Sequence, residues 1–396
     1  MKINETACFF IVVILSIIFL FVGSRFAAHE QPQADDMFMS SYYTGVVTEI
    51  IHHEIEEWEM GVGFWETVTQ IHFNARITRG ERRGETIIAS QFLDTHHLSN
   101  DPEVEVGNRI ILFYDDFAER FYFANFVRIN AIAVLGVVFL ALVILFARKK
   151  GFNAIVALGF TCLAIFMVFI PAILAGRNVY VTTLVICIYA IVSTLLLVIG
   201  PNKKSLAAML GCLGGILTAG VLMVFMDNVL RLTGVMDSET QFLMFMLSDN
   251  PIDLRAIIFA SVILGAVGAI MDVAMSIASS LWELRLTGGV SDFKSIIKSG
   301  FSIGKDILGT MLNTLILAYI GSSLSLLLLI FATATSMTDL LNMEMIVVEF
   351  LRALVGSFGM LLAIPLTAAV CAWLYSSIEE DEEERNDSSV DKHVLP

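Results

Sequence analysis

Residues 256–277 read AIIFASVILGAVGAIMDVAMSI, and only one side chain in this stretch, that of Asp272, is ionisable. A helix needs about 20 mostly apolar residues to cross the roughly 30 Å hydrocarbon core of a bilayer. The stretch has that length, and it lacks the polar stripe of a helix on the surface of a soluble domain. It therefore predicts a transmembrane helix with one acid inside the membrane.

Seven further stretches have a similar length and composition: Ala7–Val22, Val127–Ala147, Phe152–Leu174, Val179–Ile199, Leu206–Met226, Ile307–Ala332 and Ala353–Tyr375. The composition of the whole chain supports this prediction, because 57% of its residues are hydrophobic and only 16% are charged. Soluble domains average nearer one half hydrophobic and one quarter charged. We therefore predict a membrane α-helical bundle of about eight transmembrane helices in a lipid bilayer. Residues 1–23 are expected to form an uncleaved anchor. A cleaved signal peptide is the alternative, because small residues follow the first apolar run.

Orientation follows from the lysines and arginines of the short loops. Ten of them lie on the side of the N-terminus and four on the other side, and the cytoplasmic side of a membrane protein carries the excess of positive charge. We expect a multi-pass protein of the plasma membrane with both termini in the cytoplasm. Residues 127–376 form the seven-helix transmembrane domain, Phe293–Phe301 is expected to lie on the inner leaflet, and the acidic tail 377–396 is expected to be cytoplasmic and disordered.

Residues 24–126 are expected to form an extracytoplasmic domain between the first and second helices. Polar and apolar residues alternate in this region, which is typical of half-buried strands. Five strands are predicted, at Tyr42–Ile51, Glu66–Thr78, Glu85–Phe92, Arg109–Tyr114 and Phe121–Val127. Five short strands in fewer than 90 residues indicate a small β-barrel-like domain of the OB type.

Six of the seven histidines fall in this domain: His29, His52, His53, His72, His96 and His97. Neighbouring side chains on a strand point to opposite faces, so His52 and His53 cannot easily share one ion. We therefore expect exposed histidines on an acidic domain, with no metal site and no cofactor. The domain carries 18 acids against 7 arginines and no lysine. We therefore expect no nucleic-acid binding, which requires a basic surface.

Polar residues inside the predicted spans are the candidates for function, because an ionisable side chain near the bilayer centre costs about 2.5 kcal/mol or more. At helical steps of three and four, Asp272 shares a face with Ser261, Gly265, Gly268 and Ser276. At about 1.5 Å per residue, Asp272 lies roughly 6 Å from the inner edge of the hydrocarbon core.

The seventh predicted span offers a partner for Asp272. Its residues Asn313 and Thr314 lie near the same edge, with Asn313 at a depth of about 9 Å. The two helices then either line a path for a small solute or ion, or are locked together by a structural hydrogen bond. The third interpretation is that Asp272 is unpaired and lies near the lipid headgroups. No zinc-protease, phosphate-loop or nucleophile-elbow motif is present, and we expect no catalytic activity.

Three segments carry a resemblance to a known family: Leu264–Ser276, Ile303–Ser323 and Gly359–Thr367, which reads GMLLAIPLT. Over roughly residues 130–375 the chain resembles the YibE/F-like family. The resemblance implies a multispanning bacterial membrane protein. It implies no established activity, so no catalytic or ligand residue follows from it.

Two hypotheses of function remain. The first is a permease or channel-like protein for a small solute or ion, with Asp272 and Asn313 on the path near the cytoplasmic side. The second is a scaffold or sensor that transports nothing and whose outer β domain binds a cell-envelope protein.

Overall fold

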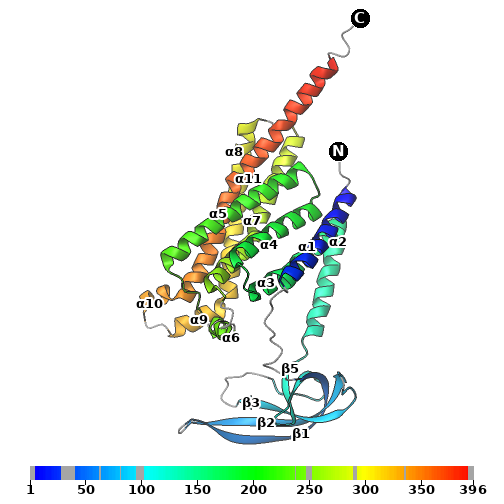
Figure 1. Ribbon diagram of the computed structural model, residues 1–396, viewed down its shortest axis with the longest axis vertical. Helices are drawn as coiled ribbons and strands as arrows, with labels where there is room; N and C mark the ends of the chain where they lie inside the picture. Colours follow the sequence, from blue (N-terminus) through cyan, green and yellow to red (C-terminus); the bar gives the residue numbers. More distant parts are fainter. Residues whose placement is uncertain are drawn as a thin grey trace. The chain divides into compact units, whose positions relative to one another are not determined.

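The computed structural model describes residues 5–27, 41–61, 64–80, 82–94, 102–236, 238–246, 252–288, 292–333 and 336–390. The chain divides into two compact units, one formed by Met1–Pro32 with Phe146–Pro396 and the other by Gln33–Leu145 (Figure 1). The first unit is helical and the second holds a five-stranded sheet. The histidines at positions 29, 96 and 97 lie outside the described residues.

The described helices are, in chain order, α1 Glu5–Ala27, α2 Ile129–Ala164, the π-helical turn η3 Ile165–Phe169, α3 Ile170–Leu174, α4 Val179–Val198, α5 Lys203–Leu230, α6 Ser238–Met246, α7 Leu254–Leu286, α8 Phe293–Ser322, α9 Leu324–Thr333, α10 Met337–Asn342 and α11 Glu344–Val390. Within the described residues, seven helices are long and apolar enough to cross a membrane: Thr6–Ala27, Ile129–Leu174, Val179–Val198, Lys203–Leu230, Leu254–Leu286, Phe293–Ser322 and Glu344–Ser376.

The difference between seven helices and the eight predicted spans arises at a single place. The helical segment Ile129–Leu174 contains two predicted spans, and its 46 residues would extend about 69 Å as one straight helix. Arg148 interrupts it with a left-handed φ of 47° and a ψ of −124°, next to Lys149 and Lys150. The backbone therefore turns at the basic residues that separate the two predicted spans.

Helices α5, α7 and α11 pack together at the centre of the helical unit, and glycines allow their close approach (Figure 1). A Cβ atom added to Gly211 of α5 would overlap Thr367 of α11, including its Cα at 2.9 Å. A Cβ on Gly215 would lie 2.8 Å from Ile270 of α7 and 3.0 Å from the Gly359 carbonyl oxygen of α11. Small residues at these positions let the three backbones meet, as in other membrane bundles.

Two expectations about segments predicted to be cytoplasmic were wrong. The segment Phe293–Phe301 is not a separate surface helix but the first part of α8, where Ile296 is buried and a Cβ on Gly304 would overlap Ile364 of α11. The acidic tail, expected to be disordered, continues helix α11 through Val390. Glutamate is a good helix former, and extending an existing helix avoids the cost of nucleation.

The sheet contains β1 Ser41–Gly61, β2 Phe64–Arg79, β3 Thr86–Asp94, β4 Arg109–Asp115 and β5 Arg120–Phe126. The five predicted strands are all present, and β1 and β2 are longer than expected. The pairings close on themselves in the order β1-β2-β3-β5-β4, because β4 pairs back with β1, and only β3 and β5 run parallel. Apolar side chains such as Ile71, Phe73 and Leu112 fill the interior.

Candidate functional site

Asp272 lies on the less buried face of α7. Gly265 and Gly268 on the same face are also exposed, and Ser276 is half-buried. A Cβ on Gly265 would lie 2.7 Å from the Tyr319 hydroxyl of α8, whereas a Cβ on Gly268 would meet nothing within 4 Å. Another helix therefore approaches this face closely at Gly265 and leaves it open next to Asp272.

Asn313 and Thr314 lie on α8, which packs against α7, and both side chains are exposed. The Thr314 hydroxyl donates to the Thr310 carbonyl oxygen of its own helix at 2.9 Å. Within the described part of the chain, no hydrogen bond or ion pair joins Asp272 to Asn313 or Thr314. The two helices are thus neighbours, but they are not locked by the polar contact that the sequence left open as an alternative.

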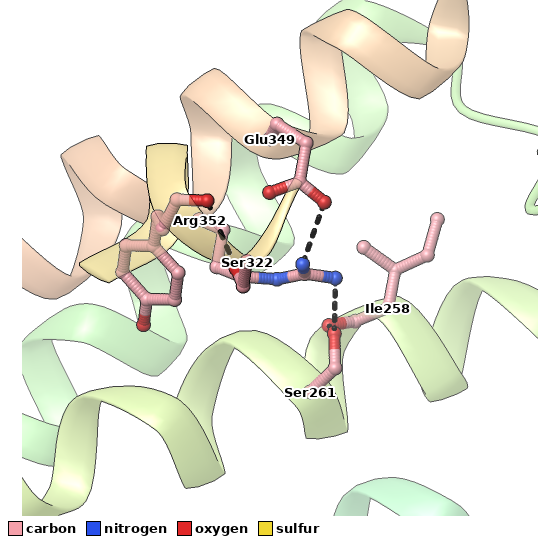
Figure 2. A network of polar contacts seen from close by, with 6 residues as sticks. Ile258, Ser261, Ser322, Glu349 and Arg352 are labelled. Carbon is pink, nitrogen blue, oxygen red and sulfur yellow. Dashed lines mark hydrogen bonds and ion pairs between the residues drawn. The ribbon is translucent and has the colours of Figure 1, made fainter. Parts of the chain in front are cut away.

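A different polar contact joins α7 to α11. Arg352 donates from Nη1 to Oε1 of Glu349 at 2.7 Å and from Nη2 to the Ser261 hydroxyl at 3.3 Å (Figure 2). The Ser261 hydroxyl in turn donates to the Ile258 carbonyl oxygen at 2.9 Å. The side chains of Arg352 and Glu349 are only 21% and 19% exposed, so this ion pair lies inside the helical bundle.

Two oxygen atoms near this pair are buried and have no hydrogen-bond partner among the described residues: Oε2 of Glu349 and the Tyr319 hydroxyl. A buried polar atom without a partner costs about 1–3 kcal/mol. Buried polar atoms in native proteins usually contact a hydrogen-bond partner, either a protein group or an ordered polar species. The pair and its neighbours are therefore able to contact a polar species that enters the bundle.

The ion pair of α11 contacts α7 through Ser261, on the same face of α7 that carries Asp272. Ser261 lies on the α7 face that carries Gly265, Gly268 and Asp272, and the interval of eleven residues from Ser261 to Asp272 corresponds to about 16 Å along the axis. The apolar pattern of the sequence did not indicate Glu349 and Arg352, because the last span was predicted to begin at Ala353. The helix begins earlier, at Glu344, and the Glu-x-x-Arg spacing was the available signal.

Two cavities occur at the end of the bundle where α7 begins. One has a volume of about 220 Å³ and is lined by residues that include Thr233, Met244 and Arg255. The second has a volume of about 180 Å³ and is lined by residues that include Arg177 and Tyr180. Both are lined by Ile252 and Asp253, and neither is lined by Asp272 or Asn313.

Several long apolar helices, which pack closely through glycines, indicate a multi-pass α-helical membrane protein. The model of the family described as YibE/F-like protein matches residues 135–377. The chain belongs to this family, which confirms the resemblance seen in the sequence. No curated protein and no solved structure matches the chain.

Proposed function

We propose that the chain is a permease or channel-like protein of the plasma membrane, which moves a small solute or ion along the polar face of α7. The observation that carries this proposal is the Glu349–Arg352 pair and its hydrogen bond to Ser261, on the same helix face as Asp272. Asp272, Gly265, Gly268 and Ser276 continue the path from α7, and Asn313 with Thr314 extends it on α8.

The energetic cost of these groups supports the proposal. A charged side chain within a transmembrane helix costs free energy, about 2.5–3.5 kcal/mol at the centre and less toward the ends, and a buried ion pair can often be replaced by apolar residues without loss of stability. A bundle that served only as an anchor would have no need for Glu349, Arg352 and Asp272. Charged residues that face the interior of a membrane protein commonly mark the route of a solute or ion.

The arrangement in the membrane is part of the same proposal. Both termini and residues 148–150 lie in the cytoplasm, and residues 24–126 lie outside it. The outer unit is an OB-like barrel, a reading supported by its closed order of five strands with β3 parallel to β5. The proposal includes no catalytic activity, no cofactor in the bundle and no binding of nucleic acid.

Flux through purified protein in liposomes tests the proposal. The liposomes carry a trapped pH indicator, and a K⁺ gradient with valinomycin sets the voltage; parallel samples carry Na⁺- and K⁺-sensitive dyes. Wild type should pass at least one of these cations, and Asp272→Asn should lower that flux about tenfold or more, since it removes a charge from the path. Asp339→Asn makes the same change at an exposed position of α10, away from the proposed path, and should keep the flux.

Two results would contradict transport of these ions through this route. One is wild-type flux equal to that of empty liposomes with every dye. The other is an unchanged flux in Asp272→Asn at equal amounts of reconstituted protein.

The second candidate function is that of a scaffold or sensor, and one surface of the sheet favours it. Tyr122 of β5 lies between Phe92 of β3 and Phe113 of β4, with ring centroids 5.7 and 5.3 Å apart. Ile88, four residues before Phe92, is 64% exposed, and exposed apolar groups that cluster in this way often mark protein-binding surfaces. A photo-crosslinker at position 88 should then capture a cell-envelope protein. The same protein should co-purify with the intact chain, and deletion of residues 40–126 should abolish co-purification while the bundle still inserts.

A further inference from the structure

Three side chains with metal-binding atoms meet on the sheet of the second unit. His52 and Glu54 lie on β1 and His72 lies on β2, and one ligand atom from each lies within 4.8 Å of the other two. Nε2 of His52 and Nε2 of His72 are each 3.7 Å from Oε2 of Glu54. The imidazole rings of the two histidines stack with centroids 4.6 Å apart.

The strand register produces this cluster. His52 pairs directly with His72 across the two antiparallel strands, after an irregularity between Ile50 and His52 shifts the register. Side chains alternate along a strand, so Glu54 lies on the same face as His52, while His53 lies on the opposite face. His53 pairs with Ile71, a residue of the barrel interior, which shows that His52, Glu54 and His72 share the outer face.

The distances between the ligand atoms show how far these side chains must move to bind one ion. Zinc lies about 2.0–2.2 Å from histidine nitrogen and carboxylate oxygen in tetrahedral sites, which places two ligand atoms roughly 3.4 Å apart. Each 3.7 Å separation from Glu54 must therefore shorten by a few tenths of an ångström, and the separation of the two histidine ligand atoms, which is at most 4.8 Å, by up to about 1.4 Å. The side chains of His52 and Glu54 are 55% and 53% exposed, so both can turn toward an ion without displacing packed atoms.

Ser90 orients the imidazole ring of His72 for metal binding. Its hydroxyl lies 2.9 Å from Nδ1 of His72, and Ser90 on β3 is the cross-strand partner of His72. When the hydroxyl accepts from Nδ1–H, the lone pair of the neutral ring is on Nε2, the atom that faces Glu54. Histidine ligands commonly have their second nitrogen held in this way, which fixes the ring and the tautomer.

We propose that His52, Glu54 and His72 bind one divalent late transition-metal ion, of which Zn²⁺ is the probe to use. Two imidazoles and one carboxylate are the protein ligands of an open zinc site, with water in the fourth position. Imidazole nitrogen favours zinc, copper and nickel over calcium or magnesium. The site lies in the sheet unit, and it does not rest on transport through the helical bundle.

The test is Zn²⁺ binding by the full-length protein in detergent, purified without a histidine tag and titrated against a chromophoric chelator. Wild type should bind one equivalent that His52→Ala and His72→Ala each lose, with the dissociation constant raised more than about 100-fold. Ser90→Ala should raise it about tenfold, as for other groups that orient a histidine ligand. Co²⁺ should give the visible absorption of a tetrahedral site in wild type and lose it in both histidine variants.

The matched control is His53→Ala, which removes a neighbouring exposed histidine from the opposite face and should leave binding unchanged. Equal loss in His53→Ala would show adventitious binding by surface histidines and would overturn the proposal. Full retention of the equivalent in His52→Ala or His72→Ala would overturn it as well. Circular dichroism of each metal-free variant should match that of wild type.

Discussion

Arg352 and Glu349 form a 2.7 Å ion pair within one turn of α11, and Arg352 also reaches Ser261, which is 91 residues away in the chain. The pair is therefore a tertiary contact between two helices as well as a local one. Apolar side chains at these two positions would cost less free energy than the charged pair does. This cost is the reason for proposing that the pair has a function.

Arg352→Met should destabilise the bundle by about 3 kcal/mol, because it leaves the Glu349 carboxylate buried without its partner. The double variant Arg352→Met, Glu349→Gln should recover most of that loss, since no unpaired charge remains. Unfolding in mixed detergent and sodium dodecyl sulfate measures both free energies. A double variant no more stable than the single one would show that the two side chains are not energetically coupled.

Gly211→Ala should destabilise the bundle by about 1–3 kcal/mol, because the added methyl group would overlap Thr367 including its backbone. Gly220→Ala is the control on the same helix, since its Cβ would lie an ordinary 3.7 Å from the ring of Phe259. The same unfolding measurement compares the two variants. Equal stability in both would mean that α5 and α11 do not approach as closely at Gly211 as the structure shows.

Glu344→Ala should increase local unfolding of the segment that follows α5. Oε1 of Glu344 accepts hydrogen bonds from the backbone N–H groups of Thr233 and Gly234, both at 2.7 Å, and Oε2 accepts from the Thr233 hydroxyl. Loss of these contacts should raise the rate of trypsin cleavage after Arg231 about tenfold, which corresponds to roughly 1.4 kcal/mol of local stability. Glu283→Ala, near the end of α7, is the control. A rate unchanged in Glu344→Ala would show that other contacts hold the segment.

Single cysteines at positions 150 and 117 should react from opposite sides of the membrane. Lys150 belongs to the basic cluster expected in the cytoplasm, and Phe117 lies in the tight turn before β5, where it is fully exposed. A membrane-impermeant maleimide applied to intact cells should label position 117 and spare position 150 until the cells are lysed. Labelling of both positions in intact cells would contradict the proposed topology.

The sequence alone was sufficient for the features that depend on local composition. Apolar length predicted each membrane helix, and alternation predicted each of the five strands, because both signals are contained in a dozen or two consecutive residues. The bounds of the predicted spans were close at α4 and α5, whereas the span predicted at Ile307–Ala332 was misplaced, since α8 extends from Phe293 to Ser322 and a separate helix, α9, begins at Leu324. Other exceptions were segments where a helix continued past charged residues, as at Glu349 and Arg352, which the apolar pattern excluded.

Contacts between distant residues were decided only by the tertiary structure. The sequence placed Asp272 on a face of small residues, but the packing of α8 brought Tyr319 to Gly265 and left Gly268 open. His52 and His72 are 20 residues apart, and only the register of β1 against β2 sets their rings side by side. Hydrophobic length and strand period are properties of the chain itself, whereas a site depends on which surfaces pack together, and that is determined by the free energy of the whole fold.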